Sequence, residues 1–146
     1  MNSLTLDAAA LIVDKSLEKG REMGFAPLTV AVLDAGGHLK VLKREDGSSL
    51  LRPEIAIGKA WGVLGMGFGG RELAQRAAKM PALFNALSDL AGGRMVPVPG
   101  GVIIRSASGE ILGSVGISGD TSDNDEICAV YGIRAAGLTP DTGSKE

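Results

Sequence analysis

The chain has 146 residues and a formal net charge of −2, and 45% of its residues are hydrophobic and 22% charged. This length predicts a single domain over residues 1–146, and this composition excludes a disordered or fibrous chain. Without a basic run, nothing indicates a nucleic-acid partner. The first residues lack a positive segment followed by an apolar one, so we expect no signal peptide or membrane anchor, and a cytoplasmic location.

Cys128 is the single cysteine, which excludes an internal disulfide and a metal site built from several cysteines. It falls in a predicted helix among small residues, and this favours packing in the core over chemical reactivity. No motif predicts a bound metal ion, and aromatic residues, at 3%, are too few for a base-stacking surface.

In the N-terminal half, the pattern predicts a helix, a β-hairpin and a second helix. Apolar residues at helical spacing, with Thr5 as N-cap, predict a helix over residues 6–24. Two apolar or alternating runs, 28–33 and 38–44, surround a Gly-Gly turn and predict the hairpin. A proline at a first helical position predicts the next helix over residues 53–66.

In the C-terminal half, glycine and proline separate the predicted elements. They are a helix at 71–80 that resumes after Pro81 to residue 90, strands at 95–98, 101–105 and 110–118, a helix at 123–136 and a flexible tail at 138–146. Consecutive strands joined by short turns predict an antiparallel sheet covered by helices, and they argue against a parallel dinucleotide-binding fold.

Four charged residues gather at the junction between the hairpin and the second helix: Arg44, Asp46, Glu54 and Lys59. Lys59 lies in an apolar stretch, where a lysine must snorkel, pair with an acid or face a cavity. Two interpretations stay open. Lys59 forms a structural ion pair with Asp46 or Glu54, or it faces a ligand.

Two further features leave alternatives open. His38, the single histidine, follows the hairpin turn and is either an exposed surface residue or an axial haem ligand or proton shuttle. Gly100 and Gly101 precede an apolar strand, where paired glycines form a tight corner or bring backbone N–H groups close to an anion or a flat ligand.

Five segments in a fixed order resemble the motif series of the GlcG/HbpS family, which is related to the C-terminal domain of the PduO-type corrinoid adenosyltransferases. They are residues 32–37 (VLDAGG), 43–47 (KREDG), 55–60 (IAIGKA), 99–102 (PGGV) and 116–119 (GISG). The resemblance covers about residues 5–137. It implies a profilin-like α-β-α sandwich with a five-stranded antiparallel sheet, hence the α+β class, assembly into a homo-oligomer, and a pocket near the glycine loop and the lysine-bearing helix.

Family members are associated with haem binding or degradation and with corrinoid metabolism. The resemblance therefore implies a small-ligand-binding protein, with haem or another tetrapyrrole as a ligand to test. The chain departs from the family in two places. Its first helix has no histidine, although some relatives ligate iron from that region, and Ile103 replaces the usual proline after Gly-Gly-Val.

Three functions compete at this stage. For a binding protein, the predicted ligand-binding residues are Arg44, Lys59, Gly100, Gly101 and His38. For a cofactor-free enzyme acting on a small carboxylate or hydroxy acid, Arg44 or Lys59 would hold the anion, and the predicted catalytic residues are Lys59, Asp46 and Glu54. The third function is a structural or accessory oligomer. The sequence leaves open whether the chain is an enzyme.

Overall fold

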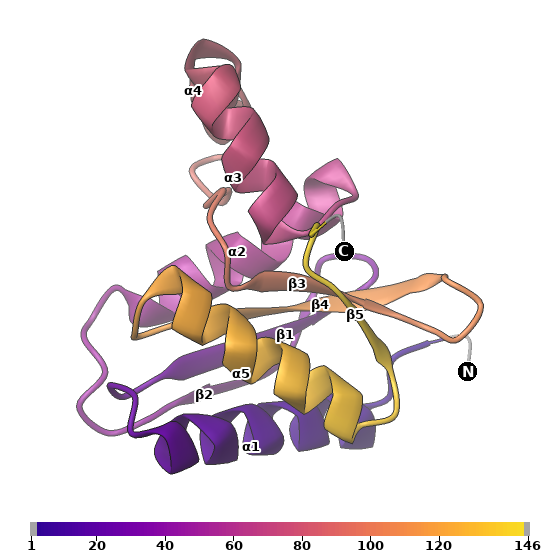
Figure 1. Cartoon of the computed structure of the whole chain (residues 1–146). Helices are drawn as coiled ribbons and strands as arrows, with labels where there is room; N and C mark the ends of the chain where they lie inside the picture. The colour runs from indigo at the N-terminus through magenta and orange to yellow at the C-terminus, as the bar shows by residue number, and fades with distance from the viewer. Residues whose placement is uncertain (1–2, 145–146) are drawn as a thin grey trace.

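The computed structural model describes residues 3–144, which form five helices and a five-stranded antiparallel sheet (Figure 1). The strand order is β2-β1-β4-β3-β5. The helices are α1 (Leu6–Met23), α2 (Arg52–Met66), α3 (Gly70–Lys79), α4 (Pro81–Leu90) and α5 (Ser122–Ala135). The strands are β1 (Thr29–Asp34), β2 (Leu39–Arg44), β3 (Gly101–Arg105), β4 (Ile111–Ser118) and β5 (Thr139–Asp141). The predicted α+β class is confirmed.

The sheet lies between two helical layers. Helices α1 and α5 cover one face, and the larger core cluster fills the space beneath them with Ile12, Val30, Ile117 and their neighbours. Helix α2 covers the opposite face. Helices α3 and α4 rise away from the sheet as an arm, and Phe84 of α4 is buried in the smaller core cluster together with Leu73 of α3 (Figure 1). These layers confirm the predicted α-β-α arrangement.

Local sequence signals explain the helix ends. The hydroxyl of Thr5 accepts a hydrogen bond from the Ala8 N–H at 3.1 Å and caps α1, as predicted. Pro81 separates α3 from α4 because it cannot donate to the preceding turn. Helix α5 is capped by the Thr121 hydroxyl, which accepts from the Asn124 N–H at 3.2 Å. The cap therefore lies just before the predicted start at residue 123.

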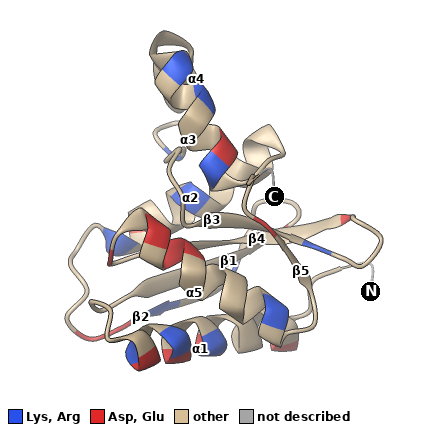
Figure 2. Ribbon diagram, viewed as in Figure 1, with Lys and Arg blue, Asp and Glu red and all other residues tan. Residues whose placement is uncertain are grey.

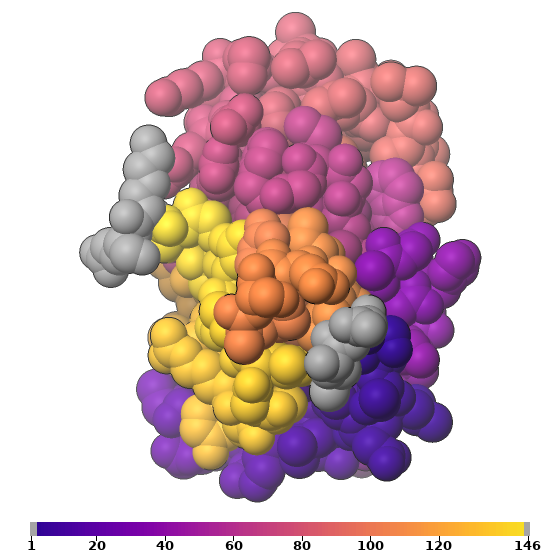
Figure 3. All heavy atoms as spheres, turned by 90° about the vertical axis from the view of Figure 1, so that its right-hand side faces the viewer, coloured from indigo at the N-terminus to yellow at the C-terminus, as the bar shows by residue number. Residues whose placement is uncertain are grey.

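Two predictions about the strands are wrong. Residues 95–98 form no strand, because the Val96 N–H bonds the Gly58 carbonyl of α2 at 3.2 Å instead of a sheet partner. The predicted tail at 138–146 contains β5, which pairs with the outer edge of β3. An ion pair between Arg105 and Asp141, at 2.9 Å, joins the same two strands. Figure 3 shows this C-terminal segment (yellow) beside the β3–β4 hairpin (orange).

Charged residues lie mostly on the outer surfaces of the helices, and acidic residues gather at the start of α5 (Figure 2). No helix within residues 3–144 is long and apolar enough to span a bilayer. The same residues contain no cluster of three or more histidine, cysteine, aspartate or glutamate side chains placed to hold a metal ion.

Candidate functional site

Lys59 is buried between the two helical layers, with 3% of its surface exposed. Its ammonium group donates to the Ile117 carbonyl at 2.8 Å and to Asp125 Oδ2 at 3.1 Å. The prediction of an ion pair is confirmed, but its partner is Asp125 of α5, and the choice of Asp46 or Glu54 is wrong. The pair links α2, β4 and α5 across the end of the sheet.

Gly100 and Gly101 lie beside Lys59, as the family resemblance implies. Gly100 has a φ of 108°, which L side chains rarely adopt, and a Cβ there would lie 2.8 Å from Lys59 Nζ. A Cβ on Gly101 would lie 2.5 Å from the Lys59 carbonyl oxygen. The two glycines thus let the lysine side chain pass the sheet and let α2 pack closely. Whether they also contact a ligand stays a prediction.

The Lys59–Asp125 pair is costly to bury. Desolvation lowers the pKa of Lys59, and the attraction of Asp125 only partly offsets this effect. Desolvation likewise raises the pKa of Asp125, although Lys59 and the Asp120 N–H, at 3.0 Å, favour its charged form. Both pKa values move toward the neutral forms because each charge has left water. Losing either partner would therefore leave the other charge buried without compensation.

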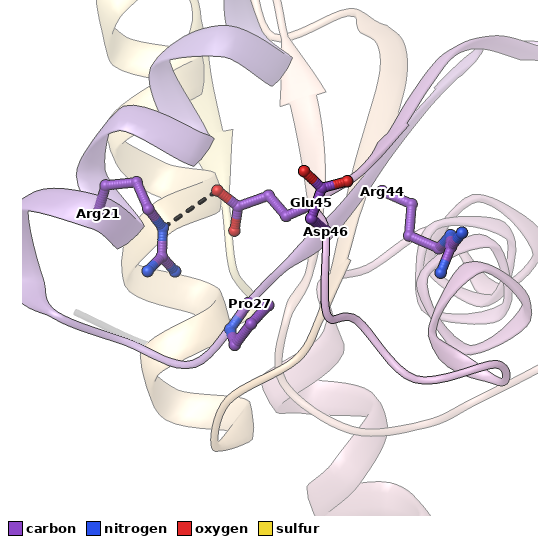
Figure 4. A pocket seen from close by; sticks show the side chains of 5 residues that line it. All are labelled: Arg21, Pro27, Arg44, Glu45 and Asp46. Atoms are coloured by element: carbon purple, nitrogen blue, oxygen red, sulfur yellow. Dashed lines mark ion pairs between the residues drawn. The ribbon is translucent and has the colours of Figure 1, made fainter.

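Arg44, Asp46 and Glu54 do not reach Lys59. Asp46 lines a surface pocket of about 380 Å³ with Arg21, Pro27, Arg44 and Glu45 (Figure 4). In this pocket Arg21 pairs with Glu45 at 3.1 Å, whereas the Arg44 side chain points away from Arg21. Glu54 is exposed in the first turn of α2. The structure thus separates the predicted catalytic carboxylates from the predicted lysine, and their catalytic roles stay predictions.

His38 lies at the hairpin turn with 82% of its side chain exposed. Its Nδ1 is 3.3 Å from Asp34 Oδ1, and it lines a shallow pocket of about 330 Å³ with residues of the turn and with Leu112. Neither Lys59 nor Gly100 lines this pocket. The five predicted ligand-binding residues therefore occupy three separate places: the buried Lys59 contact, the end of β2 and the hairpin turn.

The largest hollows described lie along α5, where the sequence analysis predicts no site. One, of about 620 Å³, is lined by Lys19 of α1 and by α5 side chains that include Ile127 and Tyr131. The other, of about 740 Å³, is lined by Arg71, Arg105, Arg134 and the C-terminal segment. An isoleucine exposed by 41% on a charged helix is the signal that sequence reasoning missed.

Cys128 is fully buried in the core, as predicted, and burial raises the pKa of its thiol to about 12. Thiolate is the reactive form, so the folded protein should resist a thiol-specific disulfide reagent at pH 8 for as long as it stays folded. One equivalent should react at once in guanidinium chloride. Rapid labelling of the native protein would contradict this assignment.

A family model described as "Haem degrading protein HbpS-like" matches residues 4–134. Among curated proteins, the chain is 24% identical over 127 residues to an uncharacterized 15.0 kDa protein in the dhaT-dhaS intergenic region of Citrobacter freundii. That alignment covers 87% of each chain.

Solved structures of other proteins share the fold. A PduOC:heme complex superimposes with a TM-score of 0.84 at 24% identity, covering 97% of this chain and 99% of the other. Klebsiella pneumoniae protein ORFY gives a TM-score of 0.82 at 23% identity, covering 94% and 92%. HbpS gives a TM-score of 0.80 at 29% identity, and the alignment covers 92% of this chain and 91% of HbpS. The first two likenesses, below 25% identity, support the fold alone.

Proposed function

Because the chain belongs to the HbpS-like family, we propose that it binds a small planar ligand with an apolar body and acidic groups, with haem as the first candidate, in the grooves along α5. The observation that carries this proposal is the adjacency of an apolar groove and an arginine-rich groove. Glu126, Val130 and Arg134 line both, so the two form one continuous surface. The solved PduOC:heme complex on the same fold makes haem the ligand to test first.

The apolar part of this surface suits a flat ring system. Ile127 and Val130 expose apolar surface on the outer face of α5, and Tyr131 lies next to them. Lys19 holds its ammonium 5.0 Å from the centroid of the Tyr131 ring. Burying such surface under a ligand is favourable by about 25 cal/mol per Å².

The arginine part suits carboxylate groups at the edge of the ligand. Arg71 already pairs with Asp123 and Glu126, and Arg105 pairs with Asp141. Arg134 forms no ion pair with any carboxylate in the described part of the chain, and it is exposed. Its guanidinium group is therefore free to bind a carboxylate in bidentate fashion.

These residues also satisfy a first test of fit to haem. Tyrosine oxygen is one of the protein ligands that hold haem iron, and Tyr131 lines the apolar groove. Bound there, haem would bring iron chemistry to the surface of α5. Tyr131, Ile127 and Arg134 would supply the ligand atom, the apolar contact and the carboxylate contact respectively.

The test is a haemin titration followed by the Soret band. We expect a saturable Soret shift with the wild-type protein. Ile127→Asp should weaken binding at least tenfold, because it places a carboxylate under the ring. Tyr131→Phe keeps the aromatic surface and should change the ferric spectrum, and Arg134→Gln should raise the dissociation constant.

His38→Ala is the matched control, because His38 lies at the hairpin turn, outside both grooves. It should leave the titration unchanged. Loss of the Soret shift in His38→Ala, with normal binding by Tyr131→Phe and Ile127→Asp, would move the site to the hairpin. A free-haemin spectrum at every ratio would rule out haem itself.

A further inference from the structure

We propose that the start of α2 forms a second binding site, for a small oxyanion of the phosphate class, built by Arg44 and Arg52 over a row of hydroxyl groups. This site lies on the α2 face of the sheet, and none of its residues lines the grooves along α5. The proposal therefore stands apart from the haem site and can fail separately.

Strand register places three polar side chains side by side beneath α2. Thr29 of β1 is paired with Arg44 of β2 on one side and with Ser118 of β4 on the other. Residues directly opposite each other project to the same face of a sheet. Arg52, the first residue of α2, donates to the Ser118 hydroxyl at 3.0 Å, which fixes that face as the one under α2.

The two arginines have no anionic partner. Arg44 donates to the Ser48 carbonyl at 3.1 Å, and Arg52 donates to the Ser49 and Ser118 hydroxyls. Within residues 3–144, neither guanidinium forms an ion pair with a carboxylate. Two guanidinium groups that rest only on neutral oxygens keep their charge available for an anion.

Two buried hydroxyls in the same place also lack partners. Thr29 is fully buried and Ser48 is 8% exposed, and the side-chain oxygens of both make no hydrogen bond in the structure. An unpaired buried hydroxyl costs stability, so each of the two would be stabilised by a group that accepts its hydrogen bond. Thr29 faces α2 between Arg44 and Ser118, where a bound oxyanion would meet it.

The N-terminal start of α2 adds a third favourable element. The helix has 15 residues, and its N-cap, Leu51, supplies no side-chain hydrogen bond to the first turn. The Arg52 N–H donates to the Ser49 carbonyl at 3.1 Å and Pro53 has no N–H, so the Glu54 N–H and the helix dipole are what favour a negative charge at this terminus. Two forked cations, hydroxyl donors and a helix N-terminus together match the several oxygens of a phosphate group better than the two of a carboxylate.

Calorimetric titration with inorganic phosphate, at constant ionic strength set by chloride, tests the proposal. The wild type should show saturable binding. Arg52→Lys keeps the charge but loses the fork and should weaken binding at least tenfold, and Arg44→Gln should do the same. Lys15→Gln is the charge-matched control, because Lys15 lies on the exposed side of α1 in a surface pair with Glu18, and it should bind phosphate like the wild type.

Thr29→Val separates a binding role from a structural one. Valine has the same shape without the hydroxyl, so it should keep or raise the midpoint of thermal unfolding while weakening phosphate binding. Unchanged phosphate affinity in Thr29→Val and Arg52→Lys, or no saturable heat with the wild type, would overturn the proposal. Acetate that binds as tightly as phosphate would overturn the assignment to the phosphate class.

Discussion

Replacing Lys59 by methionine is expected to lower the free energy of unfolding by about 3–5 kcal/mol, the usual cost of removing one partner from a buried ion pair. Methionine fills a similar volume but leaves Asp125, 1% exposed, without its cation. It also removes the donor that now satisfies the Ile117 carbonyl. Urea denaturation at pH 7 measures the loss.

The loss should depend on pH in a defined direction. Burial already raises the pKa of Asp125, and removal of Lys59 raises it further. A carboxyl with a raised folded-state pKa destabilises the fold above its unfolded pKa, and this penalty vanishes as the carboxyl is protonated in both states. The difference between variant and wild type should therefore shrink as the pH falls from 7 toward about 4.

The double variant Lys59→Met, Asp125→Asn is the companion measurement. An uncharged amide at position 125 can still accept from the Asp120 N–H, so the double variant should be more stable than Lys59→Met alone at pH 7. A single variant with wild-type stability would show that the pair contributes nothing. A loss of equal size at pH 4 and pH 7 would show that its origin is packing and not charge.

Replacing Gly116 by alanine is expected to cost about 3 kcal/mol or more, at the upper end of the effects of overpacking. A Cβ at this position of β4 would collide with the Ala56 carbonyl oxygen of α2 and would lie 2.8 Å from the Ala60 nitrogen. Both obstacles are backbone atoms, so α2 must move away from the sheet. Thermal unfolding of the purified variant measures the effect.

Gly65→Ala is the matched control, because it makes the same chemical change within α2. Its Cβ would meet only the Trp61 ring, at an ordinary contact distance of 3.5 Å. Alanine is favoured over glycine inside a helix by about 0.5–1 kcal/mol, so this variant should be slightly more stable than the wild type. Equal effects of the two substitutions would contradict the close approach of α2 to β4.

The sequence predicts the regular elements well where a local pattern determines them. Helical spacing and a cap residue place α1, turn residues place the β1–β2 hairpin, and Pro81 divides the helical arm. Prediction from the sequence fails where a contact between residues far apart in the chain determines the local structure. Residues 95–98 have the composition of a strand but bond to α2, and β5 is a short segment containing Pro140 that pairs with β3.

The candidate sites show the same division. Composition identifies Lys59 as a lysine that needs a partner, but the partner, Asp125, lies 66 residues away in the chain and is brought near only by the packing of α5. The polar row at the start of α2 depends on strand register, which periodicity does not determine. Charged neighbours in the sequence identify Arg44 as a candidate site residue, whereas Thr29 has the pattern of an ordinary residue in an apolar strand.

The two outer strands of the sheet have a consequence for self-association. An exposed strand edge is a template on which another chain can add a strand, and natural proteins protect such edges with short strands, proline and positive charge. At one side β5 is three residues long and contains Pro140. At the other side β2 carries Lys40, Lys43 and Arg44. Aggregation through a continued sheet is therefore opposed at both sides, and ordered assembly of copies is left to the helical surfaces.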